Sequence, residues 1–140
     1  MPDLSIGRLA KAADVKVPTI RFYEQIGLMP TPARTQSDQR VYGASAVQRL
    51  RFIRHARQLG FDIKQIEALL GLADRPNLPC AEADRIARAH LESVDEKIAQ
   101  LTRLRHELAR MTANCGLGIT ADCKVIEVLS DHGLCEHEPH

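Results

Sequence analysis

The residues best suited to chemistry in this 140-residue sequence lie in its second half. Cys115 and Cys123 stand eight residues apart in a segment with two glycines, so both thiols can close on one ion. Thiolate sulfur is a soft ligand for Zn, Cd, Hg, Pb and Cu(I), and two thiols can also form a disulfide. The chain end adds a possible second metal site, Cys135, His137 and His140, because Cys- and His-rich tails can bind metal.

The fourth cysteine, Cys80, precedes a long predicted helix. From about residue 81 to residue 111 the sequence has no Gly or Pro, and apolar residues recur at alternating steps of four and three. This heptad spacing predicts a helix about 45 Å long that pairs with a second helix. We therefore expect a homodimer. The apolar seam comprises Ala87, Leu91, Val94, Ile98, Leu101, then Leu104 or Leu108, and Met111.

The charge is distributed unevenly along the chain. Residues 1–75 contain 12 Lys and Arg against 7 Asp and Glu, whereas residues 76–140 contain 7 against 11. A basic half suggests a polyanionic partner for that half. No run approaches 18 apolar residues, and the N-terminus lacks the regions of a signal peptide, so we expect a cytoplasmic protein without a membrane segment. In a reducing cytosol, metal binding is a better expectation for the cysteines than a structural disulfide.

The basic half shows the signals of a helix-turn-helix. Ser5 is suited to cap a first helix, Pro18 suits the first turn of a second, and Gly27 suits its end. Residues 28–42 are rich in helix-breaking residues and end with strand character, which predicts a two-stranded wing. Two further helices are predicted at 45–59 and 63–72. Another short helix is predicted at 124–129.

Several segments together are very similar to the MerR family of transcription regulators. They occur in the family's order and spacing, and the resemblance covers residues 5–130. The segments are IGRLAKAA at 6–13, TIRFYE at 19–24, Gly27-Leu28, RVY at 40–42 and RFIRHARQLGF at 51–61.

The resemblance implies a mainly α fold with three parts. A winged helix-turn-helix head occupies 1–75, and an antiparallel coiled-coil dimerisation helix occupies 76–112. A metal-binding loop, a short helix and a tail occupy 113–140. Members of this family activate transcription from an overlong promoter spacer. The metal-loaded dimer bends and untwists the duplex so that RNA polymerase engages both promoter elements. We expect this function, and no enzymatic activity.

The second helix of the motif is expected in the major groove of promoter DNA. Arg21 is placed to pair with guanine. Arg40 and Tyr42 resemble the family's backbone-gripping residues, and phosphate contacts of that kind set the register. Phe22 is expected in the core. For Tyr23 two alternatives remain, a place in the core or a contact with phosphate. The predicted DNA-contacting residues are Lys16, Thr19, Arg21, Tyr23, Arg34, Arg40 and Tyr42.

The long helix decides which cysteines can meet. Most of the span between Cys80 and Cys115 is helical, which separates them by roughly 50 Å within one chain. In an antiparallel dimer the start of one helix lies beside the end of its partner. We therefore predict two equivalent sites, each with Cys80 of one subunit and Cys115 and Cys123 of the other. This agrees with the arrangement known in the family.

The donor set predicts a soft divalent ion, one per protomer. Three thiolates suit Hg, Pb or Cd, while Zn usually takes a fourth ligand. The family's Cu(I) sensors have a similar loop but carry serine where this chain has Cys80. Its zinc sensors have two adjacent cysteines and a histidine in the loop. We rank Cd and Pb ahead of Zn and Hg.

Two alternatives remain open, a Cu(I)-responsive regulator of the same family and a thiol redox sensor using Cys115 and Cys123. The family's iron–sulfur branch has four cysteines in the loop, so a cluster is not expected. A drug-binding regulator would need a larger ligand domain than the segment after the long helix provides.

Overall fold

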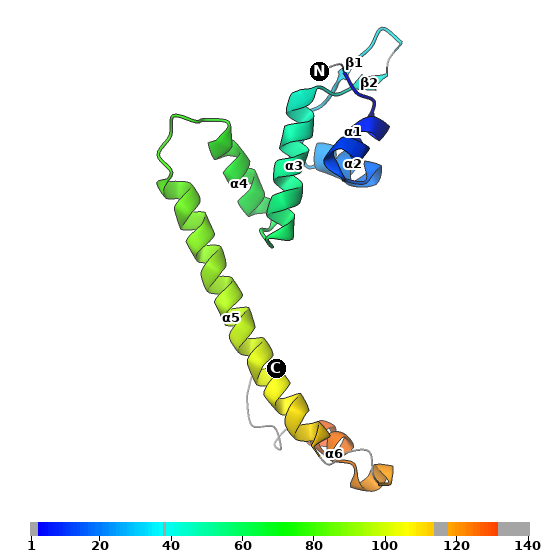
Figure 1. Cartoon of the computed structure of the whole chain (residues 1–140), viewed down its shortest axis with the longest axis vertical. Coiled ribbons are helices and arrows are strands. Elements are labelled where there is room, and N and C mark those ends of the chain that lie inside the picture. The colour runs from blue at the N-terminus through cyan, green and yellow to red at the C-terminus, as the bar shows by residue number, and fades with distance from the viewer. Residues whose placement is uncertain (1–2, 38, 114–117, 132–140) are drawn as a thin grey trace. The chain divides into compact units, whose positions relative to one another are not determined.

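The computed structural model describes residues 3–37, 39–113 and 118–131 of the chain (Figure 1). The chain divides into two compact units, Met1–Ala83 and Asp84–His140. The elements are mainly helical, as expected: α1 (Ile6–Ala13), α2 (Val17–Gln25), β1 (Ala33–Arg34), β2 (Arg40–Val41), α3 (Ala44–Gln58), α4 (Ile63–Ala73), α5 (Ala81–Thr112), the 3-10 turn η1 (Thr120–Asp122) and α6 (Lys124–Ser130).

The helix-turn-helix forms where local signals predict it. The Ser5 hydroxyl accepts a hydrogen bond from the Arg8 backbone N–H at 3.3 Å and caps α1. Asp14 ends α1 in the left-handed region, at φ 56°, and Pro18 lies in the first turn of α2. After α2, Gly27 has φ 81°, which glycine adopts without steric cost. Asp14 and Pro18 thus separate α1 from α2 by a tight turn, while Ser5 and Gly27 lie at the outer ends of the pair.

The wing is a short antiparallel hairpin. β1 and β2 pair Ala33 with Val41 and Arg34 with Arg40. The following residue, Tyr42, exchanges backbone hydrogen bonds with Leu4, at 2.8 Å from its N–H and 2.7 Å to its carbonyl. The wing is therefore anchored to the segment that precedes α1.

A mainly aliphatic core, which also contains Tyr23 and Tyr42, includes residues of α1, α2, α3 and α4 within the first unit. On α3, Leu50 and Ile53 belong to this core and are fully inaccessible. The expectation that Phe22 lies in the core is wrong, because its side chain is 50% exposed. Ile20 and Tyr23, three residues apart, share the inward side of α2, and the 100° step per residue turns Phe22 outward.

A capping box begins α4. The Asp62 carboxylate accepts a hydrogen bond from the Gln65 N–H at 2.8 Å, and the Gln65 side-chain oxygen accepts one from the Asp62 N–H at 2.9 Å. We expect Asp62→Ala to lower the free energy of unfolding by about 1 kcal/mol, because an N–H at the helix start loses its acceptor. Urea unfolding followed by circular dichroism, at one protein concentration, measures this change.

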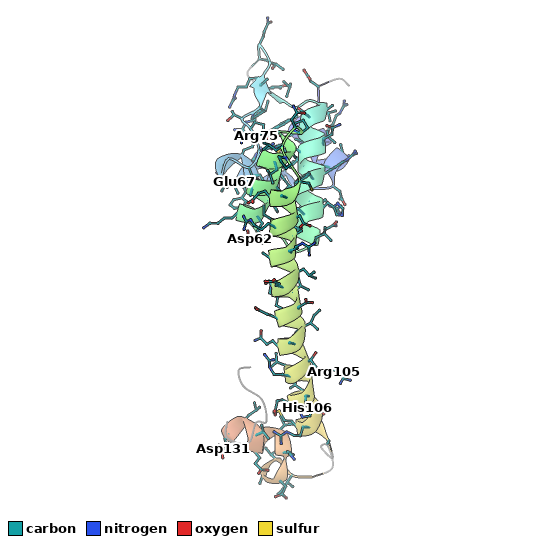
Figure 2. All side chains as sticks on the ribbon, turned by 90° about the vertical axis from the view of Figure 1, so that its left-hand side faces the viewer. Asp62, Glu67, Arg75, Arg105, His106 and Asp131 are labelled. Carbon is teal, nitrogen blue, oxygen red and sulfur yellow. The ribbon has the colours of Figure 1, made fainter. Side chains whose placement is uncertain are left out.

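The control for Asp62→Ala is Glu67→Ala on the same helix (Figure 2). Glu67 is exposed, and its side chain makes no hydrogen bond or ion pair with any residue that the structure describes. Its removal should change the stability by less than about 0.5 kcal/mol. Equal unfolding midpoints for the two variants would contradict the stabilising role of the cap.

The second unit consists of most of α5 followed by η1 and α6. Figures 1 and 2 both show α6 beside the C-terminal end of α5. Val128 of α6 and Met111 of α5 are buried there, together with the Glu107 carboxylate, which accepts a hydrogen bond from Arg110 at 2.9 Å. Met111, which the heptad pattern placed in the seam, is thus covered within its own chain. The pattern could not anticipate that α6 would fold back onto α5.

Most of the rest of the predicted seam is open to solvent within one chain, although Val94 is half-buried. The most exposed apolar side chains of α5 belong to four seam positions, with exposed fractions between 57% and 63%: Leu91, Ile98, Leu101 and Leu108. Leu104, the alternative to Leu108, is half-buried. Among the described residues, no helix is long and apolar enough to cross a membrane.

Candidate nucleic-acid interface and metal-binding residues

A basic cleft lies between α2 and the wing. Its volume is about 630 Å³. Each of three elements contributes one exposed guanidinium group to it: Arg21 from α2, Arg34 from β1 and Arg40 from β2. Arg34 and Arg40 face each other as partners in the hairpin. Guanidinium groups gathered on a concave surface are suited to phosphate, which their planar N–H donors match.

One carboxylate lies in this basic cleft. Glu24 accepts a hydrogen bond from Tyr42 Oη at 2.9 Å and forms an ion pair with Arg40 Nη1 at 3.2 Å. Burial, and next the hydrogen bond to Glu24, raise the pKa of Tyr42 above its usual value of 10.0, so this hydroxyl stays protonated. Tyr42 is 3% exposed. The hydroxyl group of Tyr42 therefore points toward Glu24 of α2 rather than into solvent.

A second hollow of about 360 Å³ follows the other side of α2 and includes Lys16 and Thr19 in its lining. Tyr23 also reaches this hollow, but it is 7% exposed and belongs mostly to the core. Arg54 and Arg57 of α3 line the same hollow, and Arg54 pairs with Asp14 at 2.9 Å. Arg54 and Arg57 were not predicted as part of this interface; their three-residue spacing, which places them on one side of α3, is the signal that could have found them.

The exposed side of α2 thus has basic hollows on both flanks. Arg21 and the half-exposed Phe22 project between them. Sequence reasoning missed Phe22, because an aromatic residue in a short amphipathic helix is usually buried. An exposed aromatic ring beside an arginine can contact a thymine methyl group or a sugar. This arrangement is suited to a helix that enters the major groove of DNA.

Two cysteines lie among the described residues, one before α5 in the sequence and one after it. Cys80 is exposed and directly precedes α5, while Cys123 is half-buried and precedes α6, which follows α5. α5 is one continuous helix of 32 residues, about 48 Å long at 1.5 Å per residue. Cys115 and the tail residues Cys135, His137 and His140 lie outside the described residues. Within the described ranges, no three Cys, His, Asp or Glu side chains are grouped to hold a metal.

Comparison with known proteins decides the family. Residues 4–72 match the family "MerR HTH family regulatory protein", and residues 47–111 match "MerR, DNA binding". The HTH-type transcriptional regulator ZntR of Escherichia coli (strain K12) is 40% identical over 127 residues, or 89% of this chain and 90% of that protein. This chain belongs to the MerR family. It is a MerR-family transcription regulator, as the sequence motifs predicted.

Other relatives are similar over comparable lengths. Heavy metal-dependent transcription regulator 2 of Rhizobium meliloti (strain 1021) is 34% identical over 91% of this chain and 87% of its own length. The structure of PbrR691 from Ralstonia metallidurans CH34 in complex with lead(II) superimposes with a TM-score of 0.80 and 38% identity. It covers 90% of this chain and 98% of that one. The MerR-family fold, with its winged head and long helix, is thereby confirmed.

Proposed function

We propose that this MerR-family protein is a homodimeric activator that binds promoter DNA and responds to a soft divalent metal ion. One observation carries the proposal. Cys80 and Cys123 stand before and after a 32-residue helix with exposed apolar side chains along its predicted seam. The exposed side chains call for a second helix to cover them, and a metal site that uses both cysteines calls for a second chain to bring them together. A second copy of the chain, running antiparallel, meets both needs. The lead(II) bound to PbrR691 supports a metal ligand of this class.

The DNA interface is proposed to centre on α2 in the major groove. Arg21 reads a base edge, with Lys16 and Thr19 beside it and Phe22 as an added apolar contact. Arg34 and Arg40 hold phosphates from the wing, where both guanidinium groups are exposed. Tyr23 and Tyr42 are almost fully buried beneath this surface. We propose that they support the DNA-contacting residues and reach DNA only at the edge of the interface.

The metal site is proposed to contain Cys80 of one subunit with Cys115 and Cys123 of the partner subunit, twice per dimer. Soft thiolates fit Cd and Pb, which we rank ahead of Zn and Hg, with one ion per protomer. The bound ion supplies a cross-link between the two subunits. Cys135, His137 and His140 are proposed as a second, weaker site. The accessible thiol of Cys80 fits the role of a ligand offered to a second chain.

Activation is proposed to act through the shape of the duplex. A dimer with two DNA-binding heads can bend and untwist the promoter between them, at a cost that depends on the sequence deformed. RNA polymerase then engages both promoter elements on the distorted DNA. The controlled genes are expected to encode metal resistance or efflux.

Metal titration tests this function first. Reduced protein is titrated with Cd, Pb, Zn, Hg and Cu(I) against a competing chelator. The expected result is one divalent ion per protomer. The ion that binds with the highest affinity identifies the preferred metal. Tightest binding of Cu(I) would favour the monovalent alternative. No stoichiometric metal together with a response to oxidant would favour a redox sensor.

Arg21 offers a direct test of the DNA interface. We expect Arg21→Ala to weaken binding to the preferred duplex by about tenfold to a hundredfold, since one bidentate base contact contributes about 1–3 kcal/mol of discrimination. Fluorescence anisotropy measures this affinity, with duplex selected from a random library by the unmodified protein. The matched control is Arg75→Ala, which removes the same charge from an exposed position after α4, outside the proposed dimer seam (Figure 2). Equal losses in both variants would show that only net charge matters.

A further inference from the structure

We propose that Glu24 is a positioning residue of the DNA interface. Its carboxylate fastens the wing to α2 and orients Arg40 toward the phosphate backbone. This inference rests on the proposed DNA binding and adds to it a residue that never touches DNA. Three features support it: the position of Glu24 in a basic cleft, its two hydrogen bonds and its burial.

The position of Glu24 is unexpected for a DNA-binding surface. Glu24 lines the cleft that also contains Arg21, Arg34 and Arg40. A negative charge here repels a polyanion, so the carboxylate opposes binding by simple electrostatics. Its side chain is only 10% exposed, which directs the carboxylate toward its protein partners. A structural contribution must therefore offset the repulsion if the cleft binds DNA.

The contact with Tyr42 joins three separate segments. The main chain of Tyr42 exchanges two hydrogen bonds with Leu4, ahead of α1, and its hydroxyl donates to Glu24 Oε2 at 2.9 Å. The N-terminal segment, the end of β2 and α2 are thus held together at one buried side chain. The two-residue strands of the wing have few ladder hydrogen bonds of their own. The Glu24–Tyr42 hydrogen bond sets where the wing lies on α2.

The contact with Arg40 sets the direction of its guanidinium group. Nη1 of Arg40 lies 3.2 Å from Glu24 Oε1, while the Arg40 side chain is 41% exposed. A guanidinium group has five N–H donors, and one contact of this kind leaves others for a second acceptor. Arg40 can therefore bind Glu24 with one edge and a phosphate with another. The fixed orientation lowers the conformational entropy that DNA binding would otherwise cost.

The test compares specific with non-specific binding. The probes are a duplex selected from a random library by the unmodified protein and a scrambled duplex of equal length. The variants are Glu24→Gln, Tyr42→Phe and the double variant, with Glu67→Gln as the control. Glu67 is exposed on α4 and pairs with none of the described residues, so its change removes the same charge from the same unit.

We expect Glu24→Gln to lower affinity for the selected duplex about tenfold and affinity for the scrambled duplex by less, because a phosphate contact that sets the register matters most where base contacts also form. The slope of log K against log salt should become shallower by about 0.9, because one phosphate contact is lost. Tyr42→Phe should act in the same direction. The double variant should lose little more than the larger single loss, since both changes break one connection. Glu67→Gln should change none of these values.

Other results would overturn the inference. Equal gains on both duplexes in Glu24→Gln would mean that Glu24 acts by charge repulsion alone. Fully additive losses in the double variant would mean that Tyr42 contacts phosphate independently of Glu24. If Glu24→Gln loses helical circular dichroism, the Tyr42→Phe variant is the test instead. An unchanged ratio of its affinities for the selected and scrambled duplexes would refute the proposal. An unmodified protein that selects no duplex would refute the proposed DNA binding itself, before any variant is compared.

Discussion

Cys80→Ser should abolish stoichiometric binding of Cd or Pb, with the affinity falling about a hundredfold or more. Removing even an outer-shell partner of a metal costs 10–100-fold, and this change removes one of three proposed ligands. Serine has nearly the same shape but is a hard, neutral oxygen donor that binds soft ions poorly. Competition with a chelator under reducing conditions measures the loss. The control, Ala81→Ser, places a hydroxyl one residue further along and keeps the thiol.

A mixed dimer tests whether the site lies between subunits. Cys80→Ser and Cys123→Ser chains, carrying different tags, are co-expressed and the heterodimer is purified. One of its two proposed sites then contains all three cysteines, and the other lacks two. We expect one tightly bound ion per heterodimer and none in either homodimer. A heterodimer that binds no metal would place the cysteines of each site in the same chain.

The second large effect concerns the exposed seam of α5. Leu101 is 63% exposed and Ile98 is 57% exposed within one chain. We expect Leu101→Glu to convert the proposed dimer to a monomer, with the dissociation constant rising about a thousandfold. Each dimer would bury two new carboxylates without partners, at a combined cost of about 4 kcal/mol. Analytical ultracentrifugation over a range of concentrations measures the change.

Thr102→Glu is the matched control for Leu101→Glu. Thr102 is the next residue, exposed and outside the seam, so the same charge there points away from the proposed partner helix. The dimer should persist in this variant. Loss of the dimer in Leu101→Glu should also abolish metal binding, because each proposed site draws on both subunits. A monomer that still binds one ion per chain would separate dimerisation from metal binding and contradict the shared site.

The local elements of this protein were predictable from the sequence. Ser5, Pro18 and Gly27 act on the backbone of their own turn, so they predicted the limits of α1 and α2 without knowledge of the fold. The heptad spacing predicted α5, and the structure has it from Ala81 to Thr112. The length of a helix depends only on its residue count, so the separation between Cys80 and the end of α5 also followed from the sequence.

Side-chain environments depended on the tertiary structure. Phe22 is exposed and Tyr23 buried because the core formed with α3 sets the rotation of α2, and neighbouring residues alone cannot specify that angle. Met111, a predicted seam residue, is buried within its own chain near the end of α5, where α6 lies beside that helix. Tyr42 points toward Glu24 because hydrogen bonds to Leu4 and to α2 hold it. Capping and periodicity act over one turn, whereas these contacts join residues far apart in the chain, and only packing brings them together.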